Sequence, residues 1–265
     1  MMGRNSIFLG MFIMLISHSF TAHSATADED IWAGLKQAYF GDREIRENAD
    51  DLLVLEAPTR AEDAAIVPIS VKSLQPQTSE RYIKNIHIII DKNPMPYSAN
   101  FHLSPSLGEI DIATRVRIDQ YTDMRAIAEM NDGSLHMVSR YVKASGGCSA
   151  PAGKDMEAAM ARLGKMQIRM RDANIGETTQ AQVVVSHPNN SGLQFDQKTR
   201  GYIPPHYVKE IIINFADENL IKLEAGISIS EDPSVRFNFT PQKHGVLKAM
   251  VNDSKDMTYS MDKQI

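Results

Sequence analysis

The positions of apolar residues along the chain predict short β-strands over most of its length. From Pro68 onward, Val and Ile recur at every second position or in short runs, which is typical of half-buried and fully buried strands. The first series of predicted strands comprises Ile69–Leu74, Tyr82–Ile90, Ser98–Leu103, Ile110–Ile118, Met124–Met130 and Leu135–Val142. The second comprises Met166–Met170, Gln180–Ser186, Val208–Phe215, Leu220–Ile229, Val235–Thr240, Val246–Asn252 and Met257–Tyr259.

Two short helices complete the predicted elements. Ile31–Phe40 has apolar residues at helical spacing and should end near Gly41. Met156–Leu163 follows the possible N-cap Asp155 and precedes Gly164, a residue that often terminates helices. Two series of short strands with prolines in the connections predict an all-β protein of two antiparallel sandwiches.

The N-terminal residues have the pattern of an export signal. Arg4 precedes an uncharged apolar run from Ile7 to Ile16, and Ala25-Thr26-Ala27 offers a cleavage site before Asp28. The run is too short to span a bilayer, so we expect no membrane span after cleavage. We therefore predict a signal peptide over residues 1–27, a first sandwich with its N-terminal helix over 28–144, a Cys-bearing arm and linker helix over 145–164, and a second sandwich over 165–265.

Charge and cysteine content narrow the function classes. The chain has a formal net charge of −5 without a basic patch, which argues against nucleic acid or an anionic membrane as a partner. Apolar residues make up 43% of the chain, enough for a packed core. With only one cysteine, no internal disulfide can form, so packing must stabilise the fold.

That cysteine, Cys148, is the main candidate for chemistry. It lies in a run of small residues that includes Gly146, Gly147 and Ser149, which predicts an exposed, flexible arm. Three interpretations are open, in order of preference: a covalent carrier or reactive thiol, an intermolecular disulfide, and an incidental buried thiol.

No catalytic apparatus accompanies the thiol in the sequence. The arm contains no His, Asp or Glu that could act as a general base. Lys143 and Lys154 are the nearby cations and should favour the thiolate modestly. The pattern therefore indicates a non-enzymatic carrier without a cofactor. A copper site of Cys148 with His and Met residues is a further alternative, although the methionines are scattered through predicted strands, where they usually fill a core.

Several short motifs resemble the SoxYZ sulfur-oxidation carrier family. In the first half, the resemblance to the Y subunit is carried by Val67–Val71, Lys92–Pro96, Thr114–Ile118, Ala126–Gly133 and Val142–Cys148. In the second half, the resemblance to the Z subunit is carried by Val184–Pro188, Ser191–Asp196, Ile203–Val208, Asp232–Phe237 and Gly245. Together these motifs cover nearly the whole chain after the signal.

The resemblance implies a periplasmic protein of two immunoglobulin-like sandwiches. It also implies that Cys148 holds sulfur intermediates covalently, on an arm formed by Gly146 and Gly147, while separate enzymes process them. In the family the Y subunit ends at Gly-Gly-Cys-Gly-Gly, whereas here Ser149-Ala150-Pro151 and a fused second half follow the thiol. Such a fused carrier resembles a branch found beside quinoprotein dehydrogenases, so the expected partners are periplasmic redox and sulfur-processing enzymes or a quinoprotein dehydrogenase system. The alternatives are a docking or structural partner of such a dehydrogenase, and a copper-binding chaperone.

Overall fold

The computed structural model describes residues 22–150, 156–171 and 173–265, which form two compact units. The first unit, Met1–Gly41, contains helix α1 (Ala22–Phe40), which ends as predicted at Gly41 with a φ of +60°. Gly41 tolerates this left-handed conformation because it has no Cβ. The helix begins at Ala22 rather than Ile31 and therefore includes Ala25-Thr26-Ala27. The predicted apolar signal run, Ile7 to Ile16, lies outside the described residues.

The second unit, Asp42–Ile265, holds the β-structure. Its first half (residues 42–150) contains β1 (Ile45–Arg46), β2 (Leu53–Glu56), β3 (Val67–Ser73), β4 (Ile83–Ile90), β5 (Tyr97–Leu103), the 3-10 helix η1 (Pro105–Leu107), β6 (Asp111–Val116), β7 (Thr122–Met130) and β8 (Leu135–Val142). Its second half (residues 156–265) contains α2 (Met156–Met160), β9 (Met166–Met170), β10 (Thr179–Val185), β11 (Phe195–Asp196), β12 (Gly201–Tyr202), β13 (Val208–Phe215), β14 (Glu218–Ala225), β15 (Ser234–Phe239), β16 (Val246–Asp253) and β17 (Thr258–Gln264).

The predicted all-β class is confirmed, and every strand expected from the sequence is present. Long strands follow the apolar pattern because alternate residues face the core: β10 alternates between buried and more exposed positions, while β4 is buried almost throughout. Four short strands, β1, β2, β11 and β12, were not predicted from the sequence. The predicted N-cap Asp155 of α2 lies outside the described residues. The helix ends at Met160 rather than at the predicted Leu163, so Gly164, with a φ of +78°, follows a turn and not the helix itself.

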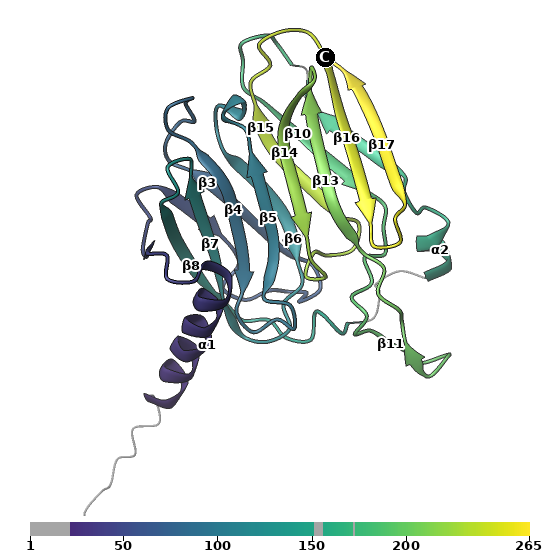
Figure 1. The fold of residues 1–265 in the computed structure, drawn as a ribbon. Helices are drawn as coiled ribbons and strands as arrows, with labels where there is room; N and C mark the ends of the chain where they lie inside the picture. The colour runs from purple at the N-terminus through teal and green to yellow at the C-terminus, as the bar shows by residue number, and fades with distance from the viewer. Residues whose placement is uncertain (1–21, 151–155, 172) are drawn as a thin grey trace, which may run out of the picture. The chain divides into compact units, whose positions relative to one another are not determined.

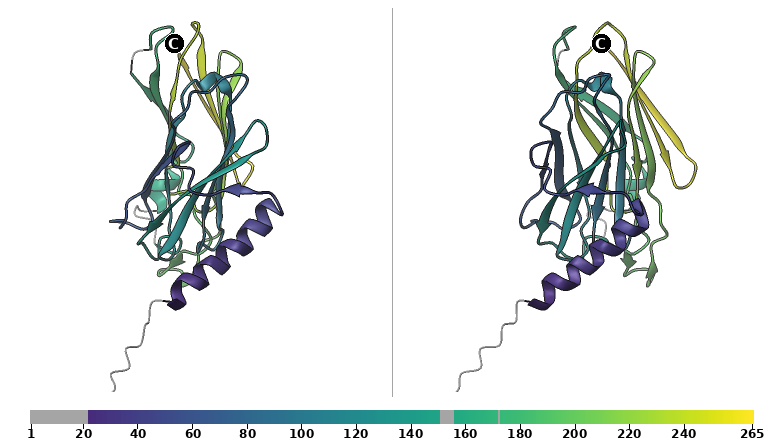
Figure 2. Two further views of the ribbon diagram at one scale, coloured as in Figure 1. Left: turned by 90° about the vertical axis from the view of Figure 1, so that its left-hand side faces the viewer. Right: turned by 60° about the vertical axis from the view of Figure 1, so that its left-hand side comes forward.

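The strands form two sheets that face each other, as the side views of Figure 2 show. The larger sheet has nine strands in the order β1-β8-β7-β4-β5-β14-β13-β16-β17, and the smaller has six in the order β2-β3-β6-β15-β10-β9. The strand pairs in both sheets are antiparallel except β1 with β8. This is the open, sandwich-like arrangement expected for immunoglobulin-like halves.

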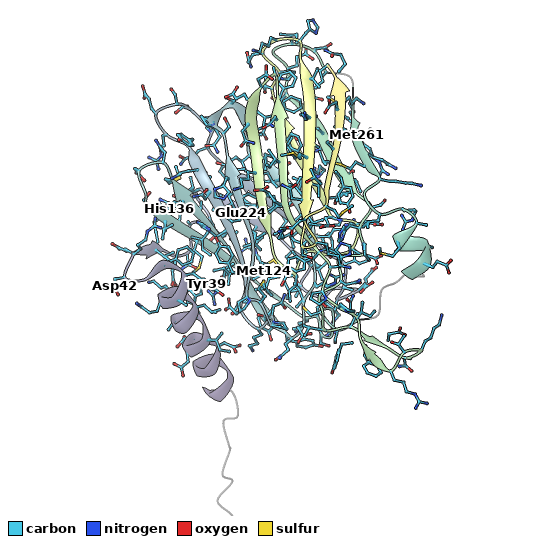
Figure 3. The ribbon with its side chains drawn as sticks, turned by 45° about the vertical axis from the view of Figure 1, so that its right-hand side comes forward. Tyr39, Asp42, Met124, His136, Glu224 and Met261 are labelled. Carbon is cyan, nitrogen blue, oxygen red and sulfur yellow. The ribbon has the colours of Figure 1, made fainter. Side chains whose placement is uncertain are left out.

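The two sandwiches are joined edge to edge. In the larger sheet β5 pairs with β14, with Phe101 opposite Leu223, and in the smaller sheet β6 pairs with β15, with Ile112 opposite Phe237. Figure 1 shows the strands of both halves running side by side, and the labelled His136, Glu224 and Met261 in Figure 3 come from β8, β14 and β17 of the one nine-stranded sheet.

One hydrophobic core is shared by both halves. A single cluster of buried apolar side chains includes Ile88 and Phe101 of the first half together with Leu223, Phe237 and Phe239 of the second. The predicted boundaries at residues 144 and 165 fall between β8 and β9, but both sheets and the core continue across them. Loops from the two halves therefore meet on a common framework, and the Cys148 segment lies among those loops.

Candidate functional site

The Cys148 segment lies against the chain that follows β6. The backbone N–H of Gly146 donates to the Asp119 carbonyl at 2.8 Å, and that of Gly147 donates to the Ile118 carbonyl at 2.9 Å. Residue numbers rise along 146–147 while those of their partners fall from 119 to 118, so the two segments run antiparallel. Continuing this pairing by one residue brings Cys148 beside Arg117. The Cys148 side chain has no exposed surface.

Gly147 allows this close approach because it has no side chain. A Cβ built on Gly147 would lie 2.0 Å from the carbonyl oxygen of Ala64 and 2.7 Å from that of Ile118. Real Cβ atoms do not come this close to backbone oxygen, so any other residue would push the segment away. The small residues around Cys148 thus serve close packing.

The second half of the chain also holds the segment. The Ser191 hydroxyl donates to the Cys148 carbonyl at 2.6 Å, and both residues are buried. Gln194, itself buried, positions Ser191 by accepting its backbone N–H at 3.1 Å. The site is therefore built from both halves.

Arg117 supplies the nearest positive charge. Its side chain is 2% exposed, and one terminal nitrogen donates to the carbonyls of Asn189 at 2.7 Å and Ile229 at 2.8 Å. Burial lowers the pKa of the Arg117 guanidinium, and the neighbouring Cys148 and Glu231 act in the opposite direction. The arginine thus lies between the thiol and the loops of the second half.

The thiol is protonated at neutral pH in this arrangement. Burial raises the pKa of Cys148 from 9.0 to about 12, and the Asp119 carboxylate raises it further than Arg117 lowers it. Because the thiolate is the nucleophilic form, the site as it stands holds sulfur in an unreactive state.

Comparisons with known proteins match both halves of the chain. The model of "Sulfur oxidation protein SoxY" matches residues 36–148, and that of "Sulphur oxidation protein SoxZ" matches residues 168–264. The chain belongs to the SoxYZ family. It is a fused SoxYZ-like protein with a sulfur-oxidation carrier role, and its SoxY match ends on Cys148 itself.

Three solved structures of different proteins are similar to parts of this chain. The sulfur carrier protein SoxY from Chlorobium limicola f thiosulfatophilum is 25% identical, with a TM-score of 0.38 over 46% of this chain and 98% of that one. A superoxide reductase (neelaredoxin) from Ignicoccus hospitalis is 15% identical, with a TM-score of 0.33 over 37% and 94%. A beta-glycosidase from Bacteroides vulgatus is 8% identical, with a TM-score of 0.24 over 87% and 26%. A comparison with curated proteins finds no match.

The exposure predicted for Cys148 is wrong. Gly146 and Ser149 are exposed as expected, but Gly147 and Cys148 are buried, because small side chains let the backbone pack tightly. The effect expected from Lys143 is wrong as well: burial dominates the shift in the thiol pKa, and Arg117 is the cation that acts on it. Lys154 lies outside the described residues.

A second group of titratable residues lies in the SoxZ half. His206 Nε2 lies 2.8 Å and His187 Nε2 3.5 Å from the same Asp253 carboxylate oxygen, and all three residues are buried. The Tyr259 hydroxyl donates to that oxygen at 3.2 Å. The sequence spacing gave no sign of this group, because its members come from three separate segments.

This group contains the one candidate set of metal ligands among the described residues, and it does not include Cys148. His187 Nδ1 accepts the backbone N–H of Asn189 at 3.0 Å, which assigns the ring proton to Nε2, facing Asp253. A metal on Nε2 would require the proton to move to Nδ1, against that N–H. The arrangement is better explained as a network in which His206 and Tyr259 hydrogen-bond to Asp253, while His187 Nε2 lies 3.5 Å from the carboxylate without a hydrogen bond among the described residues.

A small hairpin follows the loop of the SoxZ half that contains Ser191 and Gln194. β11 and β12 carry Phe195 and Tyr202, whose rings meet edge to face with centroids 5.6 Å apart and are 46% and 70% exposed. Figure 1 shows β11 at the end of a projection from the sheets. The base of the hairpin includes Gln194, which positions Ser191 against Cys148. None of the described helices is both long and apolar enough to cross a membrane.

Proposed function

We propose that Cys148 is the carrier thiol and that the structure represents its closed state. The observation that carries the proposal is that the only cysteine of the chain is also the last residue of the SoxY match. The thiol is buried and protonated, so it must leave the site before it can react. The segment around it opens for loading and closes again over the sulfur.

Few interactions hold the segment closed among the residues that the structure describes. Three hydrogen bonds are formed by Gly146, Gly147 and Cys148 with Asp119, Ile118 and Ser191. At about 1 kcal/mol net for each bond, opening costs on the order of 3 kcal/mol, which leaves about 1% of molecules open. That population is sufficient for reversible loading by a reagent or by a partner enzyme.

Tetrathionate is a suitable probe of this chemistry, because it supplies its own oxidising equivalents. The Cys148 thiolate attacks an inner sulfur of tetrathionate, the central S–S bond breaks, and thiosulfate leaves with the bonding electron pair. The thiol proton goes to solvent. The product is a cysteine thiosulfonate adduct with one negative charge on its sulfonate group.

The experiment is intact mass spectrometry of the native chain after incubation with tetrathionate, with Cys148→Ser as the control. The proposal predicts one thiosulfonate group per chain, absent from the variant and removed by a small thiol. A native chain that stays unlabelled while the denatured chain reacts completely would contradict the role.

The compartment and the partners form part of the same proposal. The predicted signal peptide over residues 1–27 supports export to the periplasm, where the partners would be sulfur-processing enzymes or a quinoprotein dehydrogenase system. The exposed Phe195 and Tyr202, beside the loop that holds Cys148, suit a docking contact. Fractionation with N-terminal mass analysis tests the compartment: a chain beginning near Asp28 in the periplasm is expected, and an intact N-terminus in the cytoplasm would contradict it.

A further inference from the structure

The guanidinium of Arg117 is a buried positive charge that lacks a carboxylate partner in the described residues. In the described part of the chain it forms no ion pair with Asp or Glu, and its hydrogen-bond acceptors are backbone carbonyls of the SoxZ half. Its Nε atom is buried and has no acceptor among the residues that the structure describes. A buried charge of this kind is costly, because carbonyl dipoles replace only part of the lost hydration.

Arg125 shows how the same chain otherwise accommodates a buried arginine. Arg125 is 8% exposed, and its Nε and terminal nitrogen bind the buried Asp91 carboxylate at 3.0 Å and 2.7 Å. Charge and hydrogen-bonding capacity are both matched there. The contrast marks Arg117 as an arginine that makes no ion pair with a described carboxylate, and Glu231 acts on it only through its charge at longer range.

Cys148 is where a negative charge could be added. The antiparallel pairing of 146–147 with 118–119 places Cys148 beside Arg117, and both residues contact the 189–191 loop through Ser191 and Asn189. A neutral thiol adds no negative charge beside the arginine. An anionic group on the sulfur would supply it.

We propose that Arg117 is the binding group for an anionic sulfur adduct on Cys148, so that the closed site accepts a persulfide or thiosulfonate better than an uncharged adduct. This inference rests on the carrier role proposed above and adds the residue that holds the charge of the adduct in the closed site. The adduct is larger than the thiol, so the segment shifts as it closes, and the guanidinium determines how strongly the anion holds it there.

Two alkyl adducts of similar size test the effect of charge without any natural cargo. Iodoacetate gives an anionic carboxymethyl group and iodoacetamide a neutral carbamidomethyl group. In both reactions the thiolate forms an S–C bond, iodide leaves, and the proton goes to buffer. Hydrogen exchange of the Gly146 and Gly147 amides then reports closure, because both amides are hydrogen-bonded in the closed state.

In the wild-type chain these amides should exchange about tenfold more slowly, or slower still, with the anionic adduct than with the neutral one. Arg117→Gln should abolish the difference, Arg117→Lys should retain part of it, and the exposed Arg171→Gln should leave it unchanged. Equal protection of the two adducts in the wild-type chain would overturn the inference, even if no Arg117 variant folds. If the carrier role itself were wrong, tetrathionate would fail to label Cys148 in the native chain, which is a separate result from equal protection of the two adducts.

Discussion

At Gly147 the chain has no room for a side chain, and this makes the closed state testable. In Gly147→Ala the new methyl group would meet the Ala64 carbonyl, so we expect the segment to stay open. Alkylation of Cys148 by iodoacetamide should then accelerate by about tenfold to a hundredfold, since the opening cost of a few kcal/mol disappears. The measurement is the alkylation rate followed by mass spectrometry.

Gly201→Ala is the matched control, because the nearest atom to a Cβ at Gly201 lies at 4.0 Å. Its alkylation rate should equal that of the wild-type chain. If Gly147→Ala also alkylated at the wild-type rate, Gly147 would not hold the segment closed.

The buried thiol makes stability depend on alkaline pH. The folded-state pKa of Cys148 is raised from 9.0 to about 12, so its contribution is complete below pH 9 and is lost as the pH rises toward 12. The free energy of unfolding should fall by about 1.4 kcal/mol per pH unit in this window. The fall ends where local opening of the Cys148 segment lets the thiol lose its proton without global unfolding. Urea unfolding of the wild-type chain and of Cys148→Ser measures this loss; parallel pH profiles would contradict it.

The sequence allowed the functional residue to be predicted, but not the burial and the contacts of that residue. The chemistry of the arm identified Cys148 as the candidate thiol, because no other cysteine is present. Its burial could not be predicted, since a run of small residues is compatible with a flexible arm and with tight packing alike. Arg117 was visible only as part of a family motif, because its partners are backbone carbonyls far away in the sequence.

At the scale of elements, the 186–194 loop connects the carrier site to the network around Asp253. His187 lies at one end of this loop, and Ser191, which holds Cys148, lies near the other. Burial raises the pKa of Asp253, but hydrogen bonds from His206 and from the backbone N–H groups of Met257 and Lys255 outweigh it and hold that pKa at about 2. The His187 side chain, 3.5 Å from this carboxylate, thus places the loop against the turn between β16 and β17.

This network should make the protein sensitive to acid. Burial, with His206 nearby, lowers the pKa of His187 from 6.5 to about 4, so the unfolded chain binds its proton first. Stability should therefore decrease as the pH falls from about 6.5 to 4, and the lowered pKa of Asp253 adds a further loss between 3.8 and about 2. The expected loss from His187 is on the order of 3 kcal/mol.

The measurement is urea unfolding between neutral and acidic pH for the wild-type chain and for His187→Gln. The variant should be less stable at neutral pH but should show a shallower slope between pH 6.5 and 4. An unchanged slope would assign the acid sensitivity to other groups. The sequence could not predict this network, because His187, His206 and Asp253 come from three segments that only the fold brings together.

At the scale of the whole molecule, the fused halves behave as one structure. The strands were predictable because their apolar patterns are local, and β9 and β13 match their predicted limits. The pairing of β5 with β14 and of β6 with β15 was not, because sequence patterns do not specify which sheet edges meet. The shared core follows from these two pairings.

The shared core predicts one cooperative transition for residues 42–265. Neither half can unfold without exposing the apolar surface that the other covers, so circular dichroism and calorimetry should report the same single transition. Leu223→Ala, on the seam opposite Phe101, should lower the free energy of unfolding by about 2–5 kcal/mol without splitting the transition. Two separate transitions would show that the halves fold as independent domains.

The rate at which native Cys148 is alkylated, measured against iodoacetamide concentration, tests the central claim most directly. A closed thiol that opens reversibly should be labelled once per chain, far more slowly than the denatured chain, with a rate that levels off when opening becomes limiting. Labelling of the native chain at the denatured rate would show that the thiol is not closed. Complete resistance of the native chain would show that it does not open, and the carrier role would then be untenable.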